Sequence, residues 1–151
     1  MVDLPALLDT NVLSELARAS PDVRVTGYLA SLPLEKTFIS AVSIAEIERG
    51  IIKLQRRDPE RAQSLRRWLE GTVLPHFGTQ ILPLDLLVAR EWGRLMGSQE
   101  MTRQPASLLD SQIAATASAH RLMVVTRNTS DFLNFPLAVY DPWTFRPPGP
   151  E

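Results

Sequence analysis

The residues best placed to do chemistry are four acids scattered along the chain: Asp9, Glu46, Asp110 and Asp131. Asp9 closes a short apolar run, whereas each of the other three stands three positions after a serine or an asparagine. Such a spacing is typical of helix N-termini, where side-chain oxygens bind free backbone N–H groups. Four carboxylates gathered in one place could instead bind a divalent cation, which would offset their mutual repulsion. The two roles are compatible, and the acids alone do not decide between them.

The residues that follow Asp110 favour a functional role for its carboxylate. Segment 113–119 is rich in alanine, serine and threonine, so a helix here can pack closely against its neighbours. A carboxylate at the head of a buried helix is costly unless a cation or good hydrogen bonds compensate its charge. The partial positive charge of a helix N-terminus also favours an anion at this position.

The elements that must position these acids follow from the spacing of the apolar residues. Short apolar runs predict strands at 6–9, 37–40, 81–83 and 122–126, and segment 138–140 is expected to end the ordered core. Helical spacing and capping residues predict helices at 11–18, 21–32, 42–57, 86–101 and 107–120, and one from Pro59 toward His76. This alternation indicates an α/β fold with a mainly parallel sheet. Ligands bind at the carboxyl ends of such strands, which is where Asp9 stands.

Composition restricts the class of protein further. A chain of 151 residues with 44% hydrophobic and 22% charged residues fits one globular domain, expected over 1–146 with a flexible tail at 147–151. The absence of cysteine excludes disulfides, thiolate zinc sites and thiol catalysis. We expect a cytoplasmic location without membrane contact, because neither a signal peptide nor an apolar run of roughly 20 residues is evident.

Four segments together resemble the motifs of the PIN-domain ribonucleases, and more narrowly the VapC toxins of the FitB-like branch. They are Leu8-Asp9-Thr10-Asn11-Val12, Ser43-Ile44-Ala45-Glu46, the run from Asp110 to Ala117, and the run from Thr126 to Phe132. The resemblance extends from Leu8 to about Trp143, with the four segments in the family's order. It implies a three-layer α/β/α domain around a short, mainly parallel sheet of about five strands.

The resemblance also implies a role for individual residues. Asp9, Glu46 and Asp110 match the family's first three acidic ligands, and Thr10 matches a supporting hydroxyl residue. The fourth acid falls in the Thr126 segment, where Asn128 and Asp131 match the pattern. Two departures concern the shape of the site: segment 102–107 lacks a glycine often found there, and Ser111 replaces a frequent alanine.

The implied activity is metal-dependent cleavage of RNA by water, leaving a 5′-phosphate and a 3′-hydroxyl. All-oxygen ligands suit Mg²⁺ or Mn²⁺. We expect Asp9, Asp110 and Asp131 to be the closer metal ligands, and Glu46 to act through water or to orient the attacking water. A histidine acid–base mechanism would have only His76 and His120, which we interpret as structural.

Contacts to RNA are harder to assign. Between Arg49 and Arg67, seven basic residues stand against two acidic ones in a chain whose net charge is −1. This run is either a solvated helix face or a phosphate-binding surface that includes Arg49 and Lys53. Arg103 and Arg127, next to the acidic motifs, are alternative phosphate contacts. The three tryptophans at positions 68, 92 and 143 are interpreted as core residues.

Partners are implied by the resemblance alone. VapC-like toxins form homodimers, possibly within larger toxin–antitoxin assemblies. A cognate VapB-like antitoxin inhibits the active site and binds operator DNA in the complex. The alternatives are a catalytically inactive PIN-like module that binds RNA or protein, and a receiver-like phosphotransfer domain. The receiver-like alternative is disfavoured because no lysine follows Lys53.

Overall fold

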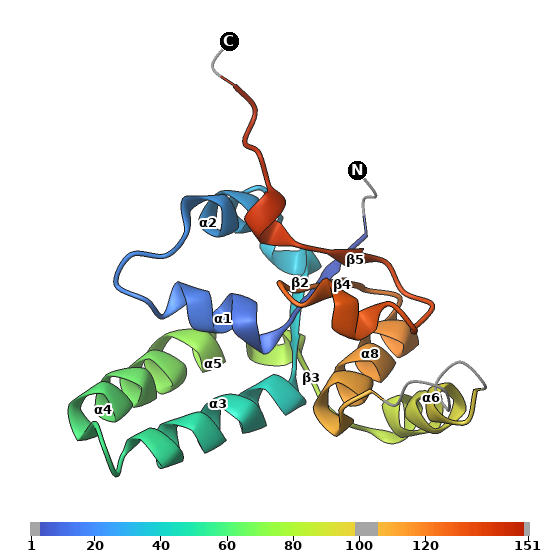
Figure 1. The fold of residues 1–151 in the computed structure, drawn as a ribbon, viewed down its shortest axis with the longest axis horizontal. Coiled ribbons are helices and arrows are strands. Elements are labelled where there is room, and N and C mark those ends of the chain that lie inside the picture. The colour runs from blue at the N-terminus through green and yellow to red at the C-terminus, as the bar shows by residue number, and fades with distance from the viewer. Residues whose placement is uncertain (1–3, 99–105, 150–151) are drawn as a thin grey trace.

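A five-stranded parallel sheet forms the centre of the computed structural model, which describes residues 4–98 and 106–149 (Figure 1). In sheet order the strands are β3 (Ile81–Leu82), β2 (Thr37–Ser40), β1 (Ala6–Leu8), β4 (Met123–Val125) and β5 (Val139–Tyr140). Every neighbouring pair runs parallel. The predicted α/β class and the predicted number of strands are therefore confirmed.

Helices connect successive strands, and most begin at a side-chain cap. The helices are α1 (Thr10–Leu16), α2 (Val23–Ala30), α3 (Ala41–Leu54), α4 (Pro59–Trp68), α5 (Leu74–Phe77), α6 (Leu86–Met96) and α8 (Leu108–His120). Short 3₁₀ segments include η4 (Thr129–Phe132) and η5 (Pro142–Thr144). The caps of α4 and α8 are Asp58 and Ser107, whose side chains accept backbone N–H hydrogen bonds. No helix in the described part of the chain is long and apolar enough to cross a membrane.

Two apolar clusters cover the two faces of the sheet and make a three-layer arrangement. Side chains alternate along each strand, so Leu8 and Val125 face one cluster while Leu7 and Val124 face the other. The first cluster draws on α1, α2, α3 and α4, and the second on α6 and α8. Figure 1 shows α6 and α8 packed together, away from α1 and α2. This arrangement matches the expected α/β/α domain.

The small residues of α8 let it pack closely, as the sequence predicted. Ala114, Ala115 and Ala117 are fully buried within the second cluster. Ser111 is also fully buried: its hydroxyl donates to the Leu108 carbonyl (2.7 Å) and accepts from the indole N–H of Trp92 (2.9 Å). Ser111, which stands where the family often has alanine, therefore joins α8 to α6 through its hydrogen bond with Trp92.

Two of the predicted helices differ from the structure for reasons that the sequence explains. The helix expected from Pro21 begins at Val23, because the Asp22 side chain accepts from the Arg24 N–H and caps it there. The helix expected from Pro59 toward His76 contains a π-helical stretch at Leu69–Val73. Pro75 explains that interruption, since it lacks an N–H and its ring excludes the carbonyl four residues earlier.

The ordered core also continues beyond its predicted end at Tyr140. Trp143 and Phe145 are each only 7% exposed, and the Phe145 ring meets Tyr28 edge-on at a centroid distance of 5.6 Å. The helix predicted at 86–101 is α6 as far as Met96, and its last three predicted residues lie outside the described part of the chain.

Candidate functional site

Asp9 lies directly after β1, at the carboxyl edge of the sheet. Its backbone N–H donates to the Val125 carbonyl on β4 (2.9 Å). Its carboxylate accepts from the Thr10 backbone N–H at Oδ1 and from the Thr126 hydroxyl at Oδ2, both at 2.8 Å. Asp9 is thus the N-cap of α1, and its carboxylate also faces a cleft at this edge. Capping and a functional role coexist in this residue.

Glu46 reaches the same cleft from α3. The capping interpretation of Ser43 and Glu46 is wrong, because α3 begins directly after β2 and Ser40 is its N-cap, accepting from the Val42 N–H at 3.0 Å. Glu46 therefore lies in the second turn. Its Oε1 accepts a hydrogen bond from the Thr10 hydroxyl (2.8 Å), which links α1 to α3 across 36 residues of sequence.

Asp110 lies in the first turn of α8, where the predicted cap is present. The Ser107 hydroxyl oxygen accepts from the Asp110 backbone N–H at 3.1 Å. Asp131 lies in η4, is exposed, and has no counterpart to this cap, because the Asn128 side chain makes no capping hydrogen bond. The capping interpretation thus holds for Asp110 and fails for Asp131.

A cleft of about 570 Å³ brings together three of the four acids. It is lined by residues from α1, α3, α8 and the segments after β4 and β5: Asp9, Thr10, Asn11, Ser14, Glu15, Arg18, Glu46, Asp110, Arg127, Asn128 and Trp143. Asp131 lines a neighbouring recess of about 430 Å³ that also contains Asp110. Asp110 is therefore shared by the two hollows, and Asp131 borders the main cleft without lining it.

Burial and the charges of neighbouring carboxylates raise the pKa of two of these acids, Asp9 and Asp110. Desolvation raises the pKa of Asp9 to about 6, against hydrogen bonds from Thr126 and Thr10 that lower it, and the charges of Asp110 and Glu46 raise it further. Burial also raises the pKa of Asp110, with a smaller contribution from Asp131. In the described part of the chain, none of the four acids forms an ion pair. No basic side chain among the described residues therefore neutralises Asp9, Glu46 or Asp110 by direct contact.

The donor chemistry of the cleft fits a hard divalent cation. Every candidate ligand is a carboxylate or hydroxyl oxygen. Among residues 4–98 and 106–149, no three acidic, histidine or cysteine side chains lie close enough together to coordinate one ion directly. Magnesium retains several waters and needs only one or two protein carboxylates. The side chains present are therefore compatible with a hydrated ion.

Thr126, which the sequence analysis did not single out, is the centre of the hydrogen-bond network. It is fully buried at the end of β4, and its hydroxyl donates to Asp9. The same oxygen accepts from the Asn11 side-chain amide (3.1 Å) and from the Asn128 backbone N–H (3.0 Å). The only sequence feature that could have indicated this role was a threonine at the carboxyl end of a central strand. Threonine is common in strands for reasons of packing, so that feature is not specific.

The candidate RNA contacts separate in the structure. Arg127 lines the cleft, whereas Arg49 and Lys53 are exposed on α3 and line none of the described cavities. Arg103 lies outside the described residues. The two histidines are absent from the cleft lining, in agreement with a structural interpretation. Trp143 is buried as predicted, yet one side of it forms part of the cleft wall.

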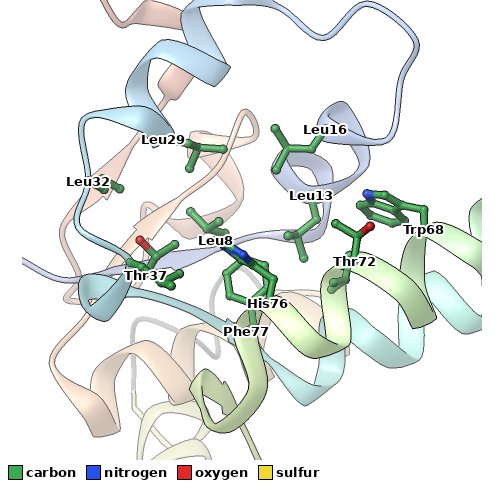
Figure 2. A pocket seen from close by; sticks show the side chains of 12 residues that line it. Leu8, Leu13, Leu16, Leu29, Leu32, Thr37, Trp68, Thr72, His76 and Phe77 are labelled. Atoms are coloured by element: carbon green, nitrogen blue, oxygen red, sulfur yellow. The ribbon is translucent and has the colours of Figure 1, made fainter.

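A second cavity of about 460 Å³ is apolar and lies on the other side of α1. Figure 2 shows Leu13 and Leu16 of α1, Leu29 of α2, and Trp68 and Phe77 around it. None of the four acids lines this cavity, and its walls hold no potential metal ligand besides His76 and the hydroxyls of two threonines. The cavity is therefore suited to apolar side chains rather than to a charged substrate.

Fold and site together define a PIN-domain protein. The PIN domain family model matches residues 6–136, and this chain belongs to that family. Toxin FitB of Neisseria gonorrhoeae is 38% identical over 137 residues, which are 91% of this chain and 97% of FitB. VapC ribonuclease Y4jK of Sinorhizobium fredii is 36% identical over 137 residues, covering 91% and 96%. The structure of FitAB bound to an IR36 DNA fragment aligns with a TM-score of 0.82 at 37% identity, covering 93% of this chain and 97% of that one. The resemblance inferred from the four motifs is confirmed.

Proposed function

We propose that this protein is the toxin of a type II toxin–antitoxin pair and acts as a divalent-metal-dependent endoribonuclease. The observation that carries the proposal is the convergence of Asp9, Glu46 and Asp110, from three different elements, on one cleft. No basic side chain in the described part of the chain forms an ion pair with any of the three. Relatives of similar length are named as a toxin and as a ribonuclease, which supports the same function for this chain.

Mg²⁺ or Mn²⁺ is the proposed cofactor, and Asp9 and Asp110 are its proposed direct ligands. Both line the cleft, and burial raises the pKa of each carboxylate despite the hydrogen bonds that it accepts, so a bound cation would stabilise the ionised forms. A bound divalent ion would lower the pKa of a coordinated water and neutralise charge on the phosphate. Asp131 would contribute from the adjoining recess that it shares with Asp110.

Glu46 is the proposed residue that orients the attacking water. Its Oε1 is held by the Thr10 hydroxyl, and no described residue donates to its Oε2. That oxygen remains available to accept a proton from water in the cleft. Thr10 and Asn128 act as supporting residues: Thr10 fixes Glu46, and Asn128 donates its backbone N–H to the Thr126 hydroxyl that holds Asp9.

The test is cleavage of a mixed RNA pool by the purified, antitoxin-free chain in Mg²⁺, Mn²⁺ or EDTA. We expect cleavage only with metal, products with 5′-phosphates, and loss of cleavage in Asp110→Asn. A folded Asp110→Asn variant that cleaves as fast as the wild type, or cleavage that persists in EDTA, would refute the metal mechanism. A folded wild-type chain that binds RNA but never cuts it would favour an inactive PIN-like module.

The proposed partner is a VapB-like antitoxin that blocks the cleft and binds operator DNA in the complex, in line with the FitAB–DNA structure of a relative. Helix α1 separates the two cavities: Leu13 and Leu16 line the apolar one, and Thr10 and Asn11 line the acidic cleft. An antitoxin segment that fills the apolar cavity can cross α1 and place a basic side chain among the carboxylates. Homodimerisation of the toxin is part of the proposal.

This docking can be tested with Leu16→Asp, which places a charge in the apolar cavity, and Leu16→Met as the volume-matched control. We expect the aspartate variant to weaken the complex with the cognate antitoxin by at least tenfold, and the methionine variant to bind within a few-fold of the wild type. Equal affinities for the wild type and Leu16→Asp would rule out this cavity as the docking site.

A further inference from the structure

Two arginines line the acidic cleft, and neither forms an ion pair with Asp9, Glu46 or Asp110. Arg127 lies just after β4, and Arg18 lies two residues beyond the end of α1. Both are exposed, and both line the hollow that contains Asp9, Glu46 and Asp110. The cleft therefore combines carboxylates with guanidinium groups. That combination suits a ligand with several phosphates, of which one binds a metal on the carboxylates and another binds a basic side chain.

Arg127 is held in place at both ends. Its backbone N–H donates to Asn11 Oδ1 at 3.3 Å, and its guanidinium carbon lies 4.9 Å from the ring centroid of Trp143. Trp143 is itself 7% exposed and fixed by a 2.8 Å bond from its backbone N–H to Asp141. The guanidinium makes no hydrogen bond or ion pair within the described part of the chain, so its N–H donors are available. A stacked guanidinium without a carboxylate partner is preorganised for an anion.

Arg18 is only partly neutralised. One of its terminal nitrogens bonds to both oxygens of Glu15, at 3.1 and 3.2 Å. The Arg18 side chain is 63% exposed, whereas Glu15 is 6% exposed and also accepts the Asp22 backbone N–H. Glu15 thus anchors the arginine, and the rest of the guanidinium fork remains free to bind an oxyanion.

We propose that Arg127 and Arg18 form a phosphate-binding pair that holds the RNA backbone on either side of the bond cut at the carboxylates. This assignment rests on the proposed ribonuclease function and selects a path for the substrate. The RNA runs over α1 and the segment after β4, and not along the basic run of α3. Arg49 and Lys53 stand one and two helical turns beyond Glu46 on α3, and neither lines the cleft.

The experiment measures binding of a fluorescently labelled single-stranded RNA oligonucleotide of mixed sequence by the full chain over a range of salt concentrations. An Asp110→Asn background prevents cleavage. Arg127→Gln and Arg18→Gln remove one charge each, and the Arg18 variant keeps an amide that can still donate to Glu15. Arg90→Gln, an exposed arginine on α6, is the matched control. The double variant Arg49→Gln/Lys53→Gln tests the rival path.

We expect each cleft variant to raise Kd about tenfold, the scale of a lost charge-assisted hydrogen bond. Each should also reduce the slope of log K against log salt by about 0.7, as for one phosphate contact on a single strand. Arg127→Lys should retain the slope, because it keeps the charge. The Arg90 control should match the background protein in both quantities.

The proposal is overturned if Arg127→Gln and Arg18→Gln match the background in Kd and slope while the wild type cleaves RNA. It is also overturned if only the α3 double variant loses slope. In either case, cleavage by the wild type means that the ribonuclease function stands and only the path is wrong. If the wild type neither binds nor cleaves any RNA, the proposed function itself fails and this assignment fails with it.

Discussion

Replacement of Thr126 by valine should damage the protein more than replacement by serine, although valine is closer to threonine in shape. Thr126 is fully buried and its hydroxyl makes three hydrogen bonds, one of them to the Asp9 carboxylate. Its two other contacts are both N–H donors, so the hydroxyl proton must point at Asp9. Valine keeps the volume and removes the donor, whereas serine keeps the donor and removes a methyl group.

The expected magnitudes follow from these contacts. Thr126 is fully buried and valine fills its volume, so water cannot take the place of the lost donor, and a hydrogen bond to a charged group contributes about 1.5–3 kcal/mol. Asn11 and Asn128 are more accessible and can turn to water, so their lost bonds add at most about 1 kcal/mol. Thr126→Val should therefore lower the free energy of unfolding by about 1.5–4 kcal/mol. Thr126→Ser should lower it by about 1 kcal/mol, the cost of one buried methyl group.

Urea denaturation in EDTA at pH 7.5 (about one and a half pH units above the raised pKa of Asp9) measures both values for the fold itself. Mn²⁺ binding measured by calorimetry, and cleavage of RNA, should be impaired in the valine variant and largely restored in the serine variant. A serine variant less stable than the valine variant would show that Thr126 acts through packing. The role given to its hydroxyl would then be wrong.

Three further changes have definite expected signs. Asp9→Asn should raise the free energy of unfolding in EDTA, because it removes a buried charge whose cost is up to about 3 kcal/mol. The loss of one hydrogen bond to the carboxylate reduces this gain. The folded-state pKa of Asp9 is about 6 against 3.8, so this gain should be complete above pH 6 and should vanish by about pH 4 in denaturation series. Thr10→Val should lower kcat with little change in KM, because it frees the Glu46 side chain without removing a substrate contact. If Thr10 acts through Glu46, Glu46→Gln should lower kcat to a similar extent. Ser40→Ala should lower the free energy of unfolding by about 1 kcal/mol in chemical denaturation, because Ser40 is the N-cap of α3. No change in stability would mean that Ser43, and not Ser40, caps the helix.

Local patterns were sufficient for the strands and for most helix starts. Apolar runs identified β1, β2 and β4, and the pairing of Asp58 with Pro59 marked the start of α4. The same local logic failed at Ser43, because the spacing of Ser43 and Glu46 imitates a capping box in the interior of a helix. α3 begins at Ala41, directly after β2, with Ser40 as its cap. The role of Glu46 is set by its hydrogen bond from Thr10, which joins residues 36 positions apart and leaves no local trace in the sequence.

The acidic site, too, could be predicted from the sequence only in part. The family motifs named Asp9, Glu46 and Asp110, and the structure brings all three to one cleft. The motifs did not reveal that Asp131 lies in a separate recess, nor that Thr126 joins Asp9 to Asn11 and to the loop at Asn128. Such features depend on how β1 and β4 lie next to each other, and a motif within one segment carries no record of its neighbour.

The position of a bound Mn²⁺ ion tests the central claim most directly. Crystals of the antitoxin-free chain soaked in MnCl₂ give an anomalous signal that locates the metal without reference to activity. We expect a peak in the cleft within coordination distance of Asp9 and Asp110, and its loss in Asp110→Asn. A chain that cleaves RNA in Mn²⁺ but has its only metal peak away from these carboxylates would contradict the site described here.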